Sequence, residues 1–249
     1  MRLRMLFLLY LIYSRGVTRT ITFDQLNTEL QALENPNTIK IFRNHGCPDS
    51  LDLYGLKIGD LKKIIRREKL TKNHELAVEL IESNNSDLIY LGLLAINPDK
   101  ITTEQIEKWN IIFRETWSQL TFGLASIVSK RDDALLFAKT WIESDYDLTK
   151  SMGWQIYSEH INNLPEAEAL LQRAKETLQT ETNRTRYSMN GFIITCGIYK
   201  DDLHEKAMEA AKSVGKVHVN LGNTACKVPD AISYIEKREI VRNNRISFD

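Results

Sequence analysis

Apolar side chains recur at helical spacing along most of this chain. Phe23, Leu26 and Leu30 begin the pattern, and a polar break over 35–37 interrupts it. The same spacing returns around 58–65, 76–81, 88–96 and 106–113. It then predicts longer helices over 116–129, 131–143, 147–162, 166–179, 184–199 and 201–213. The run 88–96 is apolar on nearly all sides, which predicts a helix deep in the core.

Polar residues and glycines mark where several of these helices begin and end. Asn73 is placed to cap the helix that follows it, and Thr102 with Gln105 forms a capping-box pattern. Gly215 suits the left-handed position that ends a helix. The stretches 44–55 and 216–230 are predicted loops, the second with at most a short extended piece. Pro229 then predicts the start of a last short helix.

Several neighbouring helices form pairs of about 30–40 residues joined by short loops, as in repeat proteins whose units bury their apolar faces only against one another. This layout predicts an all-α fold, a right-handed superhelical solenoid of HEAT-like (ARM-type) antiparallel helix pairs. Only 5 prolines and 11 glycines in 249 residues favour long helices over a turn-rich β fold. We expect one HEAT-like-repeat domain over 23–240, an apolar N-terminal extension over 1–22 and a polar tail over 241–249.

The apolar extension has three interpretations. Arg2 and Arg4 precede an apolar run that ends at Tyr13, as in a signal peptide, but Arg15 and Arg19 follow closely. The run is too short to span a bilayer. A signal peptide, a helix docked on the body and upstream sequence included by an early start codon all stay open at this point. We expect a cytoplasmic protein.

Charge and residue chemistry narrow the function classes only modestly. The chain has 33 basic and 33 acidic residues, and a net charge of zero is not typical of nucleic-acid-binding proteins. A neutral total can still hide a basic face. Three cysteines without a CxxC pair and five histidines without ligand spacing lead us to expect no metal and no cofactor. We also expect a monomer.

Four stretches carry a family resemblance. They are Tyr54–Ile64, His74–Leu80, Asn97–Lys100 with Trp109 and Trp117, and a C-terminal group formed by 215–217, 226–231 and 234–237. In this order and spacing they resemble the AlkD-like DNA alkylation repair family of HEAT-like-repeat alkylpurine DNA glycosylases. The resemblance implies a basic concave face that cradles duplex DNA. It also implies the release of cationic N3- or N7-alkylpurines, with tryptophans and one aspartate contacting the deoxyribose.

The position of the catalytic aspartate is the main departure from that family. The family pattern has a tryptophan followed four residues later by the aspartate; here the tryptophan is Trp117 and the acid position is Thr121. Breaking the glycosidic bond of an alkylpurine moves positive charge onto the sugar, and a fixed carboxylate stabilises that charge by about 3–4 kcal/mol. Neither Thr121 nor Ser118 carries a charge. From the residue types alone, Thr121→Asp is expected to raise activity by on the order of ten-fold.

Further DNA-binding residues are predicted by the resemblance and by local charge. The resemblance implies a basic residue near the lesion at Lys150 and a second aromatic residue near Phe192. The densest basic run lies over 57–72, where Lys62, Lys63, Arg66 and Arg67 are candidate phosphate contacts or simply a solvated helix face. Arg184 and Arg186 open a late helix whose amides could share a phosphate with them.

Three functions fit these observations. The favoured one is a DNA-binding member of the family, without strong glycosylase activity, that binds duplex DNA without sequence preference. The second is an active glycosylase in which another acid, such as Glu115, replaces the aspartate. The third is a protein-binding HEAT scaffold, which the zero net charge permits.

Overall fold

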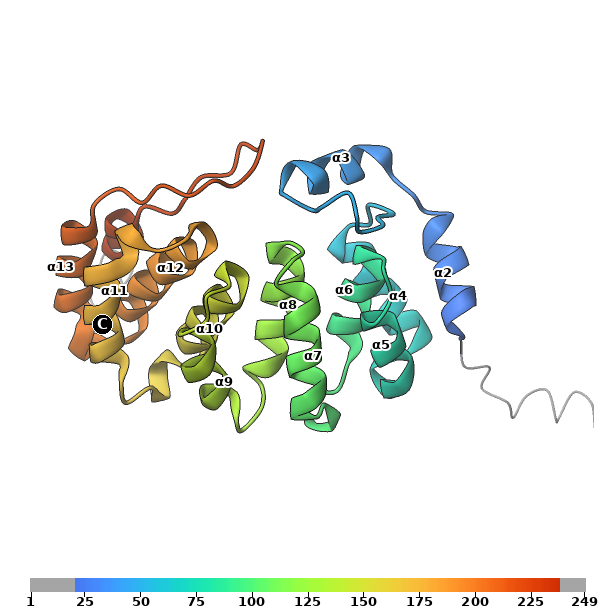
Figure 1. Ribbon diagram of the computed structural model, residues 1–249, viewed down its shortest axis with the longest axis horizontal. Coiled ribbons are helices and arrows are strands. Elements are labelled where there is room, and N and C mark those ends of the chain that lie inside the picture. The colour runs from blue at the N-terminus through green and yellow to red at the C-terminus, as the bar shows by residue number, and fades with distance from the viewer. Residues whose placement is uncertain (1–20, 238–249) are drawn as a thin grey trace, which may run out of the picture.

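The computed structural model describes residues 21–237 and shows a curved stack of helices (Figure 1). The predicted all-α, HEAT-like solenoid class is confirmed. No strand occurs within 21–237, where an isolated bridge joins Asp52 to Asn85. The helices are α2 (Phe23–Gln31), α3 (Pro36–Asn44), α4 (Ile58–Glu68), α5 (His74–Ile81), α6 (Ser86–Ala95), α7 (Thr103–Phe113), α8 (Ser118–Val128), α9 (Ala134–Trp141), α10 (Asp147–Glu159), α11 (Ala167–Thr177), α12 (Asn183–Tyr199) and α13 (His204–Val214), with residues 231–237 also helical.

The predicted helix ends agree with the structure at several caps. The Asn73 side chain accepts the Leu76 N–H, and Thr102 and Gln105 form the reciprocal capping box. Gly215 ends α13 with a φ of +66°. Helix α3 was not predicted, because its nine residues begin directly at the polar break with Pro36.

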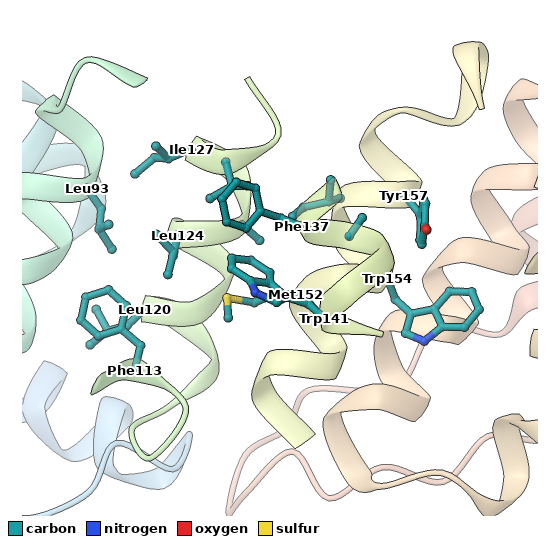
Figure 2. Packing of buried hydrophobic residues seen from close by; sticks show 14 of the residues in the cluster. Leu93, Phe113, Leu120, Leu124, Ile127, Phe137, Trp141, Met152, Trp154 and Tyr157 are labelled. Carbon is teal, nitrogen blue, oxygen red and sulfur yellow. The ribbon is translucent and has the colours of Figure 1, made fainter. Parts of the chain in front are cut away.

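Four helices form a continuous central row. Helix α6 packs against α8, α8 against α10 and α10 against α12. Each of these four helices also packs against the helix that precedes it in the chain, namely α5, α7, α9 and α11. Figure 2 shows the core of this row, where Leu124, Trp141 and Met152 meet between successive pairs. These side chains are at most 2% exposed. The predicted deep helix is α6, whose residues from Ser86 to Leu93 are buried apart from Tyr90.

Two glycines set the spacing within helix pairs. A Cβ on Gly92 of α6 would lie 2.7 Å from the Ala77 carbonyl oxygen of α5, and one on Gly153 of α10 would lie 2.9 Å from the Ala138 oxygen of α9. Both distances are too short for a real side chain. The same close approach therefore recurs in two pairs, which reveals a repeat that is weak in the sequence.

After α13 the chain crosses back toward the beginning of the arc. Residues 216–230, which we call the strap, project from the α12–α13 end and reach α3 (Figure 1, red). The Asn223 N–H donates to the Asn44 carbonyl oxygen at 3.0 Å. The two ends of the helical arc are thus joined by a segment that the sequence predicted only as a loop.

Most of the predicted apolar extension, residues 1–20, and the predicted polar tail lie outside the described residues. Between residues 21 and 237, we find no helix with the length and apolar character needed to cross a bilayer.

Candidate nucleic-acid interface

Trp117 occupies the N-cap position of α8, and both sides of its indole are held by protein. Its Nε1–H donates to Ser86 Oγ at 3.1 Å, and the Phe42 ring of α3 lies 5.3 Å from its own. The residue is 5% exposed. The Phe42 side chain of α3 therefore packs against the tryptophan that the resemblance places beside a deoxyribose. In this conformation little of the indole is available to a ligand.

Thr121 lies one turn into α8 and is completely buried. Its hydroxyl donates to the Ser118 carbonyl oxygen at 3.2 Å, so it is satisfied within its own helix. The first turn of α8 has no acidic residue and no side-chain cap. The acid position of the family pattern is thus uncharged and enclosed.

Glu115, the proposed substitute acid, lies in the short turn between α7 and α8. Its side chain is 70% exposed, and one oxygen is 3.8 Å from Arg114 Nε. Arg114 in turn lies with its guanidinium carbon 3.6 Å from the centre of the Tyr146 ring, a cation–π contact that the sequence did not predict. A carboxylate this exposed is screened by water, which weakens any effect on a developing cation.

Phe192 lies in the core of the α10–α12 interface. It is fully buried, and its ring meets Trp154 edge-on with centroids 5.3 Å apart. Its neighbour Gly191 is the position that opens outward, since a Cβ there would meet nothing within 4 Å.

Lys150 and the start of α12 form a polar cluster between α10 and α12. Lys150 Nζ lies 3.0 Å from Glu181, and both side chains are less than 20% exposed. The Asp147 carboxylate accepts the N–H groups of Arg184 and Thr185 at 2.8–3.0 Å. Burial raises the pKa of Asp147, but its hydrogen bonds outweigh that effect and hold the pKa below its usual value.

The two arginines at the start of α12 are partly buried, and the backbone N–H groups beside them are already hydrogen-bonded. Burial lowers the pKa of Arg184, with Asp147 and Tyr187 opposing that shift. Arg186 has its Nε buried without a hydrogen-bond partner in the described part of the chain. The sequence predicted that the amides at this helix start could bind a phosphate. In the structure the N–H groups of Arg184 and Thr185 donate to the Asp147 carboxylate instead.

The candidate cations of α4 lie on its exposed surface, but they are not equally free. Lys63 pairs with Asp60 at 2.8 Å, and Arg67 pairs with Glu29 at 2.6 Å and with Glu68. Lys62 and Arg66 are exposed, and no ion pair or hydrogen bond joins their side chains to any residue within 21–237. These two side chains are therefore the available phosphate contacts on this helix.

A buried carboxylate positions α4. Asp87 of α6 accepts the consecutive N–H groups of Tyr54, Gly55 and Leu56 at 2.7–2.9 Å, just before α4 begins. Burial raises the pKa of Asp87, and the three backbone hydrogen bonds oppose that shift. The sequence signal was an aspartate in the first turn of a helix, which is too common to identify this role.

Two of the three cysteines, Cys47 and Cys196, are buried, while Cys226 is exposed. Burial raises the pKa of Cys47 to about 11 and that of Cys196 to about 12, so both thiols stay protonated at neutral pH. No group of three or more His, Cys, Asp or Glu side chains suited to a metal occurs between residues 21 and 237.

These features define a helical-repeat protein whose enclosed tryptophan and uncharged threonine lie where the resemblance places a glycosylase centre. Residues 26–235 match the sequence profile of the family described as DNA alkylation repair enzyme. The chain belongs to that family.

The chain is also similar to individual proteins and to a solved structure. "Uncharacterized protein Lmo0209" of Listeria monocytogenes serovar 1/2a is 98% identical over 217 residues, which cover 87% of this chain and 97% of the relative. "Uncharacterized protein Lin0241" of Listeria innocua serovar 6a is 94% identical over the same extent. A solved structure, described as "a new family of proteins related to the HEAT-like repeat DNA glycosylases with affinity for branched DNA structures", is 29% identical, with a TM-score of 0.77. The match covers 90% of this chain and 95% of that one.

Proposed function

We propose that this protein binds the phosphate backbone of DNA without sequence preference and does not excise alkylpurines. We also propose that it binds branched DNA more tightly than plain duplex DNA. The observation that carries the absence of chemistry is the site around Trp117. The acid position holds a buried threonine, and the tryptophan is covered by Phe42. The preference for branched DNA is supported by the affinity stated for the structural neighbour.

Positive charge develops on the sugar when the glycosidic bond of an alkylpurine breaks. Excision of an alkylpurine needs a carboxylate close to the forming oxocarbenium ion, and removing such a group costs about 3–4 kcal/mol of transition-state stabilisation. Thr121 supplies no charge, and the exposed Glu115 lies in a different, solvated turn. Loss of that term alone lowers the rate on the order of a hundred- to a thousand-fold.

Two cations of α4 support DNA binding. Lys62 and Arg66 stay free of carboxylates within the described residues, while Lys63 and Arg67 are paired. Phosphate contacts of this kind fix a protein on DNA without reading its sequence. A neutral chain can therefore still hold DNA on one face.

Base release is the first test. Duplex DNA carrying N7-methylguanine is incubated with the protein, and alkaline cleavage measures abasic sites. We expect release no faster than in DNA alone, because the acid position is uncharged. Robust release would contradict the proposal and favour the substitute acid; loss of that release in Glu115→Gln would then identify it.

Charge reversal on α4 is the second test. Lys62→Glu with Arg66→Glu should weaken binding to duplexes of any sequence and to a four-way junction. It should also flatten the dependence of log K on log salt by about 0.9 per lost phosphate contact. The matched control is Lys63→Glu with Arg67→Glu, which makes the same change in net charge at cations that already have partners.

The comparison between the two double variants shows whether Lys62 and Arg66 contact DNA. We expect the control to weaken binding less than the first variant does. Unchanged affinity in the Lys62 and Arg66 variant would remove α4 from the interface. An absence of salt-dependent DNA binding by the unaltered protein would favour the protein-binding scaffold instead.

A further inference from the structure

Arg114 and Tyr146, which we call the platform, form an exposed stack between the α7–α8 turn and the beginning of α10. We propose that the platform binds an unpaired base of branched DNA, which stacks on the Tyr146 ring at the branch point. This inference rests on the proposed preference for branched DNA and adds the chemical group that is recognised. It follows from the geometry of the platform, its exposure and its place among the helices.

The Tyr146 ring is held in position by the protein. The guanidinium carbon of Arg114 lies 3.6 Å from the ring centre. About one turn away in each helix, Thr149 Oγ1 of α10 donates to Asn110 Oδ1 of α7 at 2.7 Å, and both of these residues are buried. The end of α7 and the beginning of α10 are therefore fixed to each other beside the platform. A ring held in this way loses little freedom when a ligand stacks on it.

The ring and the cation are both incompletely used within the protein. Tyr146 is 42% exposed although Arg114 lies against one face of its ring. The Arg114 side chain makes no hydrogen bond found within 21–237, and its contact with the exposed Glu115 is 3.8 Å long. A cation–π pair that served only to join two helices would contribute more if it were desolvated. The exposed ring is thus a surface on which a flat group can stack.

Tyr146 is the exposed aromatic side chain that is held most closely. Trp117 and Phe192, the two rings implied by the resemblance, are at most 5% exposed. Tyr199 and Tyr234 are exposed as well, but within 21–237 no cation is found against the first ring, and the cation beside the second lies 5.3 Å from its centre. The platform therefore offers a preorganised stacking surface that the enclosed rings cannot provide.

The platform lies on an edge of the stack that includes the beginning of α4. Asp87 of α6 accepts N–H groups just before α4, and Trp117 before α8 donates to Ser86 of α6. Asp147 of α10 accepts N–H groups at the beginning of α12. The platform joins the turn before α8 to the beginning of α10. Helices α4, α6, α8, α10 and α12, which follow one another along the arc in Figure 1, thus begin along one edge.

An unpaired base suits this surface better than a phosphate alone. Two exposed carboxylates, Glu115 and Asp145, are the sequence neighbours of the platform, and they disfavour a site built for an anion. Stacking of a base on an aromatic ring is tolerant of base identity, in agreement with binding that lacks sequence preference. In a paired duplex the bases stack on one another, whereas an unpaired base at a branch point is easier to unstack.

A fluorescent base tests the platform directly. The probe is a three-way DNA junction with one unpaired 2-aminopurine at the branch, and the reference is a duplex in which 2-aminopurine is paired with thymine. Stacking on a tyrosine ring lowers the fluorescence of 2-aminopurine. We expect the full chain to lower the fluorescence of the junction and not that of the duplex. Binding to both DNAs without any such change at the junction would overturn the platform alone. A protein that binds neither DNA would overturn the proposed function.

Variants of the ring separate stacking from a structural role. Tyr146→Ala should weaken binding to the junction about ten-fold, remove the fluorescence change and weaken duplex binding much less. Tyr146→Phe, which keeps the ring, should preserve both signals. The matched control is Tyr199→Ala, which removes another exposed tyrosine and should change neither. Equal losses on junction and duplex in Tyr146→Ala, or an unchanged fluorescence signal, would overturn the proposal. Tyr146→Leu, which keeps an apolar contact for Arg114, gives the same comparison if Tyr146→Ala is unstable.

Arg114 is a positioning residue in this proposal and has its own test. Arg114→Lys keeps the positive charge but loses the planar group that lies against the ring. It should weaken binding to the junction several-fold and reduce the fluorescence change, with duplex binding affected less. Full junction binding with the full fluorescence change in this variant would overturn the role of Arg114 in holding the ring.

Discussion

At the residue scale, the environment of Thr121 determines what a carboxylate could do there. The side chain is completely buried and lies in the first turns of α8, whose N-terminus favours negative charge. That favourable effect is about 0.3–1 kcal/mol, whereas a buried carboxylate without a partner costs about 3 kcal/mol or more. The burial therefore changes the expectation drawn from residue types alone.

We predict that Thr121→Asp lowers the free energy of unfolding by about 3 kcal/mol and does not raise base release. The acid would be fully buried, and Trp117, four residues before it, would stay covered by Phe42. Chemical denaturation and alkaline cleavage of N7-methylguanine duplex measure the two effects. Thr121→Val, which removes only the hydroxyl, is the control for stability. A stable Thr121→Asp protein with ten-fold faster release would show that the site opens readily.

The residue types at this site are read directly from the sequence, whereas their surroundings are not. The resemblance pointed to Trp117 and to the uncharged acid position through a local spacing of four residues. It could not show Phe42 over the indole, since α3 is separated from α8 by most of the N-terminal half. For the same reason Phe192 was a candidate DNA contact, although Trp154 on another helix encloses it.

At the element scale, helix pairs depend on close backbone contact at a few glycines. Gly153→Ala places a methyl group within 2.9 Å of the Ala138 oxygen and 2.8 Å of the Ile142 backbone nitrogen. We predict a loss of about 1–3 kcal/mol in the free energy of unfolding, because α9 and α10 must move apart. Gly191→Ala, also within a helix but facing open space, should instead stabilise by about 0.4–1 kcal/mol. Thermal and urea unfolding distinguish the two, and equal effects would contradict the packing argument.

A second element-scale prediction concerns the joint between α10 and α12. The pKa of Asp147 is held below its unfolded value, so its contribution is present above about pH 4 and is lost as pH falls through the folded pKa. We predict that Asp147→Asn lowers the free energy of unfolding by about 1 kcal/mol or more at pH 7, and that the difference shrinks below pH 4. Asp145→Asn is the matched control, because its carboxylate is exposed and forms no hydrogen bond or ion pair found within 21–237. A pH-independent difference would contradict the role of the charge.

At the scale of the whole molecule, the stack could be predicted because its order is local. Each helix pair buries its own apolar stripe against a neighbour. The apolar periodicity, the caps and the loop lengths were therefore enough to predict the fold class. The closure of the arc could not be predicted in this way. The strap lacks an apolar period, and its contact with Asn44 joins two parts of the chain that no local pattern connects.

The meeting of Asn44 and Asn223 also has a consequence during synthesis of the chain. A stack of helix pairs can begin to assemble as soon as the first pairs emerge, since each unit contacts mainly its neighbours. The strap tip emerges after all twelve described helices from α2 to α13. Only a chain that is complete to residue 223 and folded throughout can make this contact. A truncated or partly folded product lacks this contact, so the Asn223–Asn44 hydrogen bond marks the finished molecule.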